Sequence, residues 1–220
     1  MIPPFLLPNN EHIIFRTFNL ILLLSLIRFS DIFVTMTIET LNILPISEWF
    51  DGLTQPLLIA GPCSAESEEQ MMETARGIAK VGKIKILRVG VWKPRSRPGT
   101  FEGAGEEALQ WLKKIKKETG LLIAVEVATP THVEKAVAAG IDVLWLGART
   151  TSNPFSVEQI AQSLNGIDIT VLVKNPVNPD LELWIGALER LNRAGINKLA
   201  AVHRGFYPYE KTRLRNIPKW

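Results

Sequence analysis

The sequence is poor in the features that mark several large classes of protein. Its 220 residues include a single cysteine, Cys63, so no disulfide can form within the chain and a reducing, cytoplasmic location is expected. The net charge is only +3, without a basic stripe interleaved with aromatic residues, so nucleic acid is not an expected partner. Apolar residues make up 46% of the chain and charged residues 21%, which argues against disorder throughout and favours a globular domain.

A long hydrophobic run is also missing. The longest apolar run covers residues 20–27 and lies between two arginines, whereas a membrane-spanning helix needs about 20 such residues. No Ala-x-Ala cleavage site follows it, as a signal peptide would require. We therefore interpret residues 1–35 as a non-native or disordered extension and residues 36–55 as a lead-in segment. A membrane anchor or uncleaved signal, and a genuine helical extension, are the alternative interpretations.

Six short apolar runs recur along the rest of the chain. Each is continuous and rich in leucine or β-branched residues, which is typical of parallel strands buried on both faces. We expect strands over residues 56–60, 85–89, 121–127, 142–147, 170–174 and 198–202.

Stretches with helical spacing separate these runs. Thr131, Ser156 and Asp180 are candidate N-caps for the last three of them. Glycines suited to a helix C-terminus follow four of the stretches, at positions 82, 120, 140 and 195. The predicted helices cover residues 66–81, 106–118, 131–139, 156–164 and 180–194.

Six strands alternating with five helices predict repeated right-handed βαβ units, which either close into a barrel or form an open doubly wound sheet. No G-x-G-x-x-G follows the first run, which argues against a dinucleotide-binding sheet. Polar and cationic residues follow nearly every run, as at the carboxyl ends of barrel strands. The sequence therefore favours an α/β fold with about six βα units of a (β/α)8 TIM barrel.

Cationic side chains end or follow four of the predicted strands. In a barrel they would face one cavity, where like charges repel each other unless anions neutralise them. Phosphate and carboxylate groups of substrates would supply that negative charge. The six cations are Arg88, Lys93, Arg95, Arg149, Lys174 and Arg204.

Other polar and aromatic residues have plainer interpretations. Cys63 alone would be a small buried hydrophobic residue, although its place in the loop after the first strand favours a function. His203 is a candidate base, but packing or a hydrogen bond to a neighbour is the favoured interpretation. Core or interface positions are expected for Trp92, Trp111, Trp145 and Trp184.

Five strings in the sequence carry a resemblance to a known family. LLIAGPCSAES, LRVGVWKPRSRPGTFEG, WLGARTTSNP, LVKNPVN and HRGF together resemble the type I 3-deoxy-7-phosphoheptulonate (DAHP) synthases of the short, barrel-only subgroup. The match covers residues 56–220 and is especially similar to bacterial forms with a chorismate mutase domain after the barrel. The sister family, 3-deoxy-manno-octulosonate 8-phosphate synthase, shares the fold, but typically has Lys-Ala-Asn where this chain has Lys-Pro-Arg-Ser.

The resemblance implies a transferase that condenses phosphoenolpyruvate with erythrose 4-phosphate on an aldolase-type barrel, the first step of the shikimate route to aromatic amino acids. Lys93 and Glu126 would be catalytic, and full-length members are commonly homo-oligomers. Phosphoenolpyruvate would be held by Arg88, Lys93, Arg149, Lys174 and Arg204. Erythrose 4-phosphate would be held by Lys93, Pro94, Arg95 and Ser96.

A divalent metal cofactor (Mn, Fe, Zn or Co) is also implied, with Cys63 as one of four ligands. In the family the other three are a His in an Asp-Pro-Ser-His motif, a Glu and an Asp on the last two strand segments, and this sequence does not contain them. A complete (β/α)8 barrel takes about 250 residues. We therefore expect strands 7 and 8 to be missing and the chain alone to be nearly inactive; a non-catalytic truncated fragment is the alternative reading.

Overall fold

The computed structural model describes residues 40–53, 56–93, 95 and 99–206. Apart from Thr40, these residues belong to one unit, Leu41–Trp220. The expected N-terminal extension lies outside the described residues. So do residues 36–39 and 54–55 of the lead-in segment, and Pro94 and Ser96.

All six predicted strands and all five predicted helices are present, with shifts of a few residues at their ends. The elements follow one another as η2 (Ile46–Glu48), β1 (Ile59–Ala60), α2 (Glu68–Val81), β2 (Ile86–Val89), α3 (Glu106–Thr119), β3 (Leu122–Val127), α4 (Pro130–Ala138), β4 (Val143–Leu146), α5 (Ala148–Thr151), α6 (Pro154–Ser163), β5 (Thr170–Lys174), α7 (Leu181–Arg193) and β6 (Leu199–Val202). The short helices η2 and α5 were not predicted.

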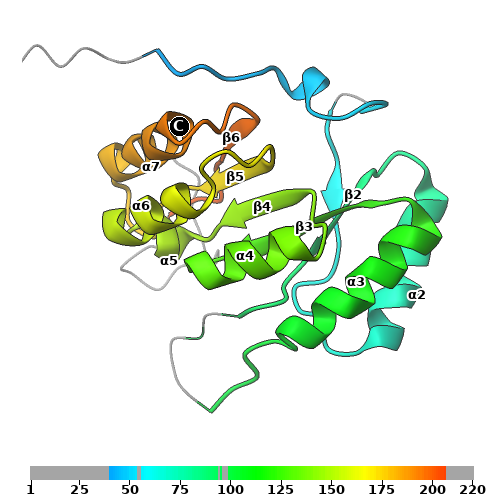
Figure 1. The fold of residues 1–220 in the computed structure, drawn as a ribbon. Helices are drawn as coiled ribbons and strands as arrows, with labels where there is room; N and C mark the ends of the chain where they lie inside the picture. Colours follow the sequence, from blue (N-terminus) through cyan, green and yellow to red (C-terminus); the bar gives the residue numbers. More distant parts are fainter. Residues whose placement is uncertain (1–39, 54–55, 94, 96–98, 207–220) are drawn as a thin grey trace, which may run out of the picture. The chain divides into compact units, whose positions relative to one another are not determined.

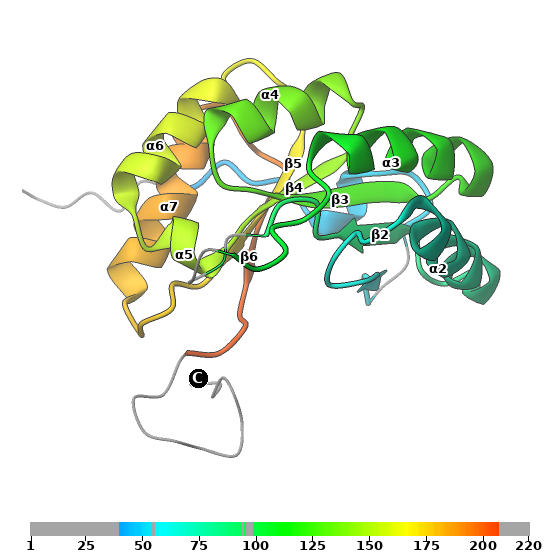
Figure 2. The ribbon, with the colours of Figure 1, turned by 90° about the horizontal axis from the view of Figure 1, so that it is seen from below.

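The six strands form one parallel sheet in the order β1-β2-β3-β4-β5-β6. Helices α2, α3, α4, α6 and α7 all lie on the same side of it (Figures 1 and 2). Sequential parallel strands with helices outside are the arrangement of a (β/α) barrel, so the predicted fold class is confirmed as a half-barrel. Within the described residues β1 and β6 are the end strands, each paired on one side only.

Two of the predicted helix starts were wrong. Helices α4 and α6 begin at Pro130 and Pro154, and their N-caps are Thr129 and Asn153 rather than Thr131 and Ser156. Proline suits the first turn of a helix, because its missing N–H is not needed there, and this moves each start toward the N-terminus. Asp180 does cap α7, since its Oδ1 accepts a hydrogen bond from the Leu183 N–H at 3.1 Å.

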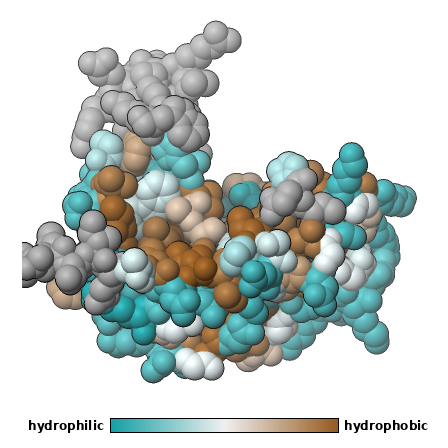
Figure 3. Space-filling model, turned by 90° about the horizontal axis from the view of Figure 1, so that it is seen from above, coloured by the Kyte–Doolittle hydropathy of each residue, from teal (hydrophilic) through white to brown (hydrophobic). Residues whose placement is uncertain are grey.

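Apolar residues are buried on both faces of the sheet, as continuous apolar strands require. The larger core lies between the strands and the helices. A second group, the inner cluster, lies on the opposite face and consists of Trp49, Ile86, Ala124, Val143, Trp145 and Leu172. Figure 3, which views the molecule of Figure 1 from above, shows apolar residues gathered across a hollowed part of the surface.

The lead-in segment adds Trp49 to the inner cluster, where it is 3% exposed. Its indole N–H donates to the Leu44 carbonyl at 3.1 Å, and the Leu44 N–H donates to the Asn197 carbonyl at 2.9 Å. Asn42 and Asn192 exchange two further hydrogen bonds, of 2.9 and 2.8 Å. These contacts fix the segment at the end of the sheet where β6 begins.

Candidate functional site

The inner cluster determines where the polar residues at the strand ends must point. Side chains two residues apart in a strand lie on the same face. Ile86, Ala124 and Leu172 face the interior, and two residues beyond each of them come Arg88, Glu126 and Lys174. Strand alternation therefore puts these three charged side chains on the same face of the sheet as the inner cluster, toward the carboxyl ends of their strands.

Electrostatic effects at Lys174 show that the charged groups are close together. Burial lowers the pKa of the Lys174 ammonium below its ordinary value, and the Glu126 carboxylate opposes this shift. The charges of Arg88, Arg204 and Lys93 lower the pKa further. Four of the six predicted cations, together with Glu126, thus share one site and carry an unbalanced positive charge.

Lys93 joins the loop after β1 to the loop after β2. Its Nζ donates a hydrogen bond to the Cys63 carbonyl at 2.8 Å and lies 3.4 Å from Cys63 Sγ. The Lys93 charge lowers the pKa of the exposed Cys63 thiol, although burial partly opposes it, and Arg88 adds to the lowering. A Cβ on Gly90 would come within 2.0 Å of the Cys63 carbonyl oxygen, so only glycine allows the two loops to approach this closely.

Trp145 lies at the centre of the same group. Its indole N–H donates to Glu126 Oε2 at 3.0 Å. The Lys174 Nζ is 4.9 Å and the Arg88 Cζ 5.8 Å from the centroid of its ring. Among the described residues, Arg88 Nε is buried without a hydrogen-bond partner, which leaves a donor for a ligand.

Asn175 was not singled out from the sequence, yet it is fully buried and holds the loop after β6. Its Oδ1 accepts from the Arg204 N–H at 2.7 Å, and its Nδ2 donates to the Gly205 carbonyl at 3.0 Å and the Pro176 carbonyl at 2.8 Å. The only sequence signal was its place between the lysine that ends β5 and a proline. Through these bonds Asn175 fixes Arg204 beside Lys174.

The remaining predicted residues lie apart from this group or outside the described chain. Arg149 is exposed in α5, directly after β4. Arg95 is exposed, and its Nε donates to the Phe101 carbonyl at 2.8 Å. The His203 ring packs between those of Trp184 and Phe206, with centroids 6.0 and 5.5 Å away, as the packing interpretation predicted.

The described residues do not form a metal site. Within them, no three His, Cys, Asp or Glu side chains gather closely enough to hold an ion. Cys63 is the single predicted ligand, and one thiolate does not make a site for a divalent transition metal. Its lowered pKa favours the thiolate form that a metal ligand needs.

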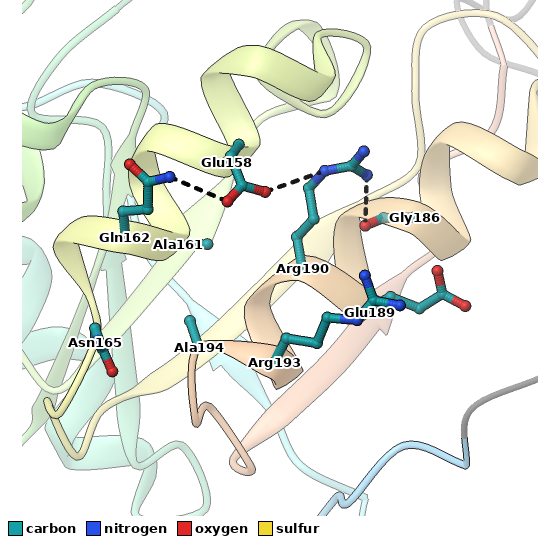
Figure 4. A pocket seen from close by; sticks show the side chains of 9 residues that line it. All are labelled: Glu158, Ala161, Gln162, Asn165, Gly186, Glu189, Arg190, Arg193 and Ala194. Atoms are coloured by element: carbon teal, nitrogen blue, oxygen red, sulfur yellow. Dashed lines mark hydrogen bonds and ion pairs between the residues drawn. The ribbon is translucent and has the colours of Figure 1, made fainter.

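A separate cavity of about 390 Å³ lies between α6 and α7 (Figure 4). Its polar side chains bind one another: Arg190 Nε lies 3.4 Å from Glu158 Oε2, Gln162 donates to Glu158 at 3.2 Å, and Arg190 Nη1 donates to the Gly186 carbonyl at 3.0 Å. None of the predicted site residues lines this cavity. We therefore place the functional site at the strand ends instead.

No helix in the described ranges has both the length and the hydropathy needed to cross a bilayer. The apolar run at residues 20–27 lies outside those ranges.

Comparisons with known proteins agree with the fold. The model of the DAHP synthetase I family matches residues 39–216. A phospho-2-dehydro-3-deoxyheptonate aldolase of Thermotoga maritima is 34% identical over 154 residues, which cover 70% of this chain and 44% of that protein. A 2-dehydro-3-deoxyphosphooctonate aldolase of Polaromonas naphthalenivorans is 38% identical over 125 residues, covering 54% of this chain and 44% of that protein.

Two solved structures from Thermotoga maritima are similar to the half-barrel. The crystal structure of its DAHP synthase aligns with a TM-score of 0.63 and 30% identity, over 73% of this chain and 45% of that one. A truncated form of its 3-deoxy-D-arabino-heptulosonate 7-phosphate synthase aligns with a TM-score of 0.60 and 28% identity, over 74% of this chain and 57% of that one. The chain thus spans less than half the length of the curated relatives named above.

Proposed function

Because the chain belongs to the DAHP synthetase I family, we propose that its protein condenses phosphoenolpyruvate with erythrose 4-phosphate. The products would be 3-deoxy-D-arabino-heptulosonate 7-phosphate and phosphate, which makes the protein a transferase of the shikimate pathway. The observation that carries the proposal is the gathering of three further cations and Glu126 near Lys174, at the carboxyl ends of parallel strands. A cytoplasmic location and a homo-oligomeric assembly are part of the same proposal.

Phosphoenolpyruvate has the charge that this site requires. Its phosphate and carboxylate would neutralise the ammonium and guanidinium groups that now lower the pKa of Lys174. Planar guanidinium groups suit either anion, and Arg88 Nε has a donor to offer. We assign phosphoenolpyruvate to Arg88, Lys93, Lys174 and Arg204, with Arg149 added from the end of β4.

Erythrose 4-phosphate is assigned to the loop after β2. Arg95 is the cation for its phosphate, and Lys93, Pro94 and Ser96 complete the assignment. In the proposed reaction C3 of phosphoenolpyruvate attacks the aldehyde carbon, water adds at C2, and phosphate leaves. Glu126, whose charge acts on Lys174, is the proposed group that positions the water, and Lys93 is proposed to act beside both substrates.

A divalent metal (Mn, Fe, Zn or Co) belongs to the proposal, with Cys63 as its candidate ligand. Since the described residues supply this one thiolate and no cluster of three ligands, they do not fit the ion by themselves. Binding of phosphoenolpyruvate, which needs only the cations, is therefore the first property to test, whereas little phosphate release is expected from this chain with manganese and both substrates.

The test is calorimetric titration of the purified chain with phosphoenolpyruvate. We expect one molecule to bind per chain and Lys174→Met to abolish binding, because it removes a partly buried cation. The matched control is Lys198→Met, since Lys198 precedes β6 at the opposite end of the sheet and pairs with Asp168 at 2.8 Å. No binding by the unaltered chain, or equal loss in both variants, would refute the assignment.

A second candidate is the octulosonate 8-phosphate synthase reaction, because several similar curated proteins are 2-dehydro-3-deoxyphosphooctonate aldolases. The Lys-Pro-Arg-Ser sequence at 93–96 favours erythrose 4-phosphate. Titrating the phosphoenolpyruvate-saturated chain with each sugar phosphate separates the two reactions. Tighter binding of arabinose 5-phosphate than of erythrose 4-phosphate would favour the second candidate.

A further inference from the structure

The two carboxylate oxygens of Glu126 lie against Trp145 of the neighbouring strand β4 and against Gly147, the residue directly after that strand. Glu126 and Trp145 are direct partners in the β3–β4 register. The indole N–H of Trp145 donates to Oε2 at 3.0 Å, and the indole is only 4% exposed. A bond from a buried donor to a carboxylate is among the stronger hydrogen bonds in proteins. Trp145 thus fixes the orientation of one oxygen.

The second oxygen fits against Gly147, which directly follows the last residue of β4 and is the N-cap of α5. A Cβ on Gly147 would come within 2.1 Å of Glu126 Oε1. The backbone at Gly147 has a φ of −71° and a ψ of 158°, which any residue adopts. Glycine is needed at this position for space alone. Trp145 in β4 thus provides a hydrogen-bond donor for the carboxylate, and Gly147 after β4 leaves room for it.

The ring of Trp145 also contacts the cations. Lys174 Nζ and Arg88 Cζ lie 4.9 and 5.8 Å from its centroid, within the range of cation–π attraction. One side chain therefore bonds the acid through its edge and attracts two cations through its face. Core packing alone would require only an apolar ring at position 145. The other members of the inner cluster have apolar side chains, except Trp49, and the Trp49 N–H donates to the Leu44 carbonyl.

We propose that Trp145 is a positioning residue that prevents the Glu126 carboxylate from forming an ion pair with Lys174. The cations then remain available to bind the anionic substrate. This inference rests on the proposed function for the identity of the anion. Without the indole N–H, the carboxylate is free to turn toward the ammonium of Lys174, to which it is already electrostatically coupled. It would then compete with phosphoenolpyruvate for the same charge.

The test is a double-substitution experiment with phosphoenolpyruvate as the probe. Trp145→Phe keeps a ring and removes the N–H, and we expect it to weaken binding about tenfold, the effect of one hydrogen bond to a charged group. In a Glu126→Gln background the same substitution should have little effect, because no carboxylate is left to compete. A packing role would instead weaken binding equally in both backgrounds, and that result, or no effect in either, would overturn the proposal.

The control is Trp184→Phe, because the Trp184 indole donates to a backbone carbonyl, that of Val173, at 3.0 Å. It should weaken binding by the same small factor whether residue 126 is Glu or Gln.

A second measurement does not depend on the ligand. In a ¹⁵N-labelled sample the Trp145 indole N–H resonance is identified by its loss in Trp145→Phe. Glu126→Gln should move this resonance upfield, because an amide is a weaker acceptor than a carboxylate, and should leave the Trp184 resonance in place. If the chain fails to bind phosphoenolpyruvate but the resonance moves, the proposed substrate is wrong and the Trp145–Glu126 link stands. An unmoved resonance overturns the link.

Discussion

The rings of Trp92 and His132 stack face to face, with centroids 4.2 Å apart and an angle of 4° between their planes. Trp92 directly precedes Lys93, and His132 lies in the first turn of α4. The His132 Nδ1 accepts a hydrogen bond from the Ala128 N–H at 3.3 Å, so it carries no proton. The stack fastens the loop that carries Lys93 to the start of a helix of the outer layer.

This stack predicts a stability that depends on pH. Burial lowers the pKa of His132 below its ordinary value of about 6.5, and the charge of Lys135 lowers it further. As the pH falls below 6.5 the unfolded chain takes up a proton before the folded chain does, so the free energy of unfolding should decrease until the folded-state pKa is reached. Urea unfolding between pH 8 and pH 5 measures this. His132→Phe keeps a ring without a titrating group. If the free energy of unfolding depends on pH in the same way in that variant, His132 is not the group responsible.

The thiol of Cys63 should react fast with alkylating reagents. Its pKa is lowered chiefly by the Lys93 charge, so a larger fraction is thiolate near neutral pH than in a free cysteine. Because the chain has one cysteine, iodoacetamide labelling followed by mass spectrometry reports on this group alone. Lys93→Met should slow labelling severalfold at pH 7. Lys85→Met, at the exposed beginning of the same strand region, should leave the rate unchanged; equal rates for both variants would show that Lys93 does not activate the thiol.

Asn175→Ala should lower both stability and anion binding. The change leaves the partly buried Arg204 N–H and the buried Gly205 carbonyl without their partner, at a cost of about 2 kcal/mol in unfolding free energy. The loop after β6 then no longer holds Arg204 beside Lys174, and phosphoenolpyruvate should bind more weakly. Chemical denaturation and calorimetry measure the two effects. Asn165→Ala, at an exposed site, is the control and should stay within about 0.5 kcal/mol.

Gly147→Ala should displace Glu126 without straining the backbone. The new methyl group would occupy the position of Oε1, so the carboxylate must turn away. We expect weaker phosphoenolpyruvate binding, as for Trp145→Phe. Adding Glu126→Ala to Gly147→Ala should restore binding, because the shorter side chain leaves room for the new methyl group. Gly77→Ala is the control, because a Cβ there meets nothing within 4 Å and should stabilise helix α2 by up to about 1 kcal/mol. Failure of Glu126→Ala to rescue binding would assign the effect to another cause.

The fold was largely predictable because its signals are local. Continuous apolar runs such as residues 121–127 identify buried parallel strands, and the glycine after each of four helices marks its end. The group of cations at the strand ends was predictable in part, since Arg88 and Lys174 end strands whose side-chain alternation is fixed. The hydrogen bonds of Asn175 and the bond from Trp145 to Glu126 were not predictable, because each depends on partners from another strand or loop. The N-caps at Thr129 and Asn153 were missed because each precedes a proline that itself starts the helix.

The lead-in segment has an effect at a distance from its own position. Trp49, held in place through Leu44 and Asn197, fills the interior of the sheet beneath Trp145 with apolar atoms. The apolar interior next to the cations therefore has a low dielectric constant. Charges beside it are screened less than they would be in water. Residues 41–53 are therefore expected to strengthen the attraction between the cations and the proposed anionic substrate without contacting that substrate.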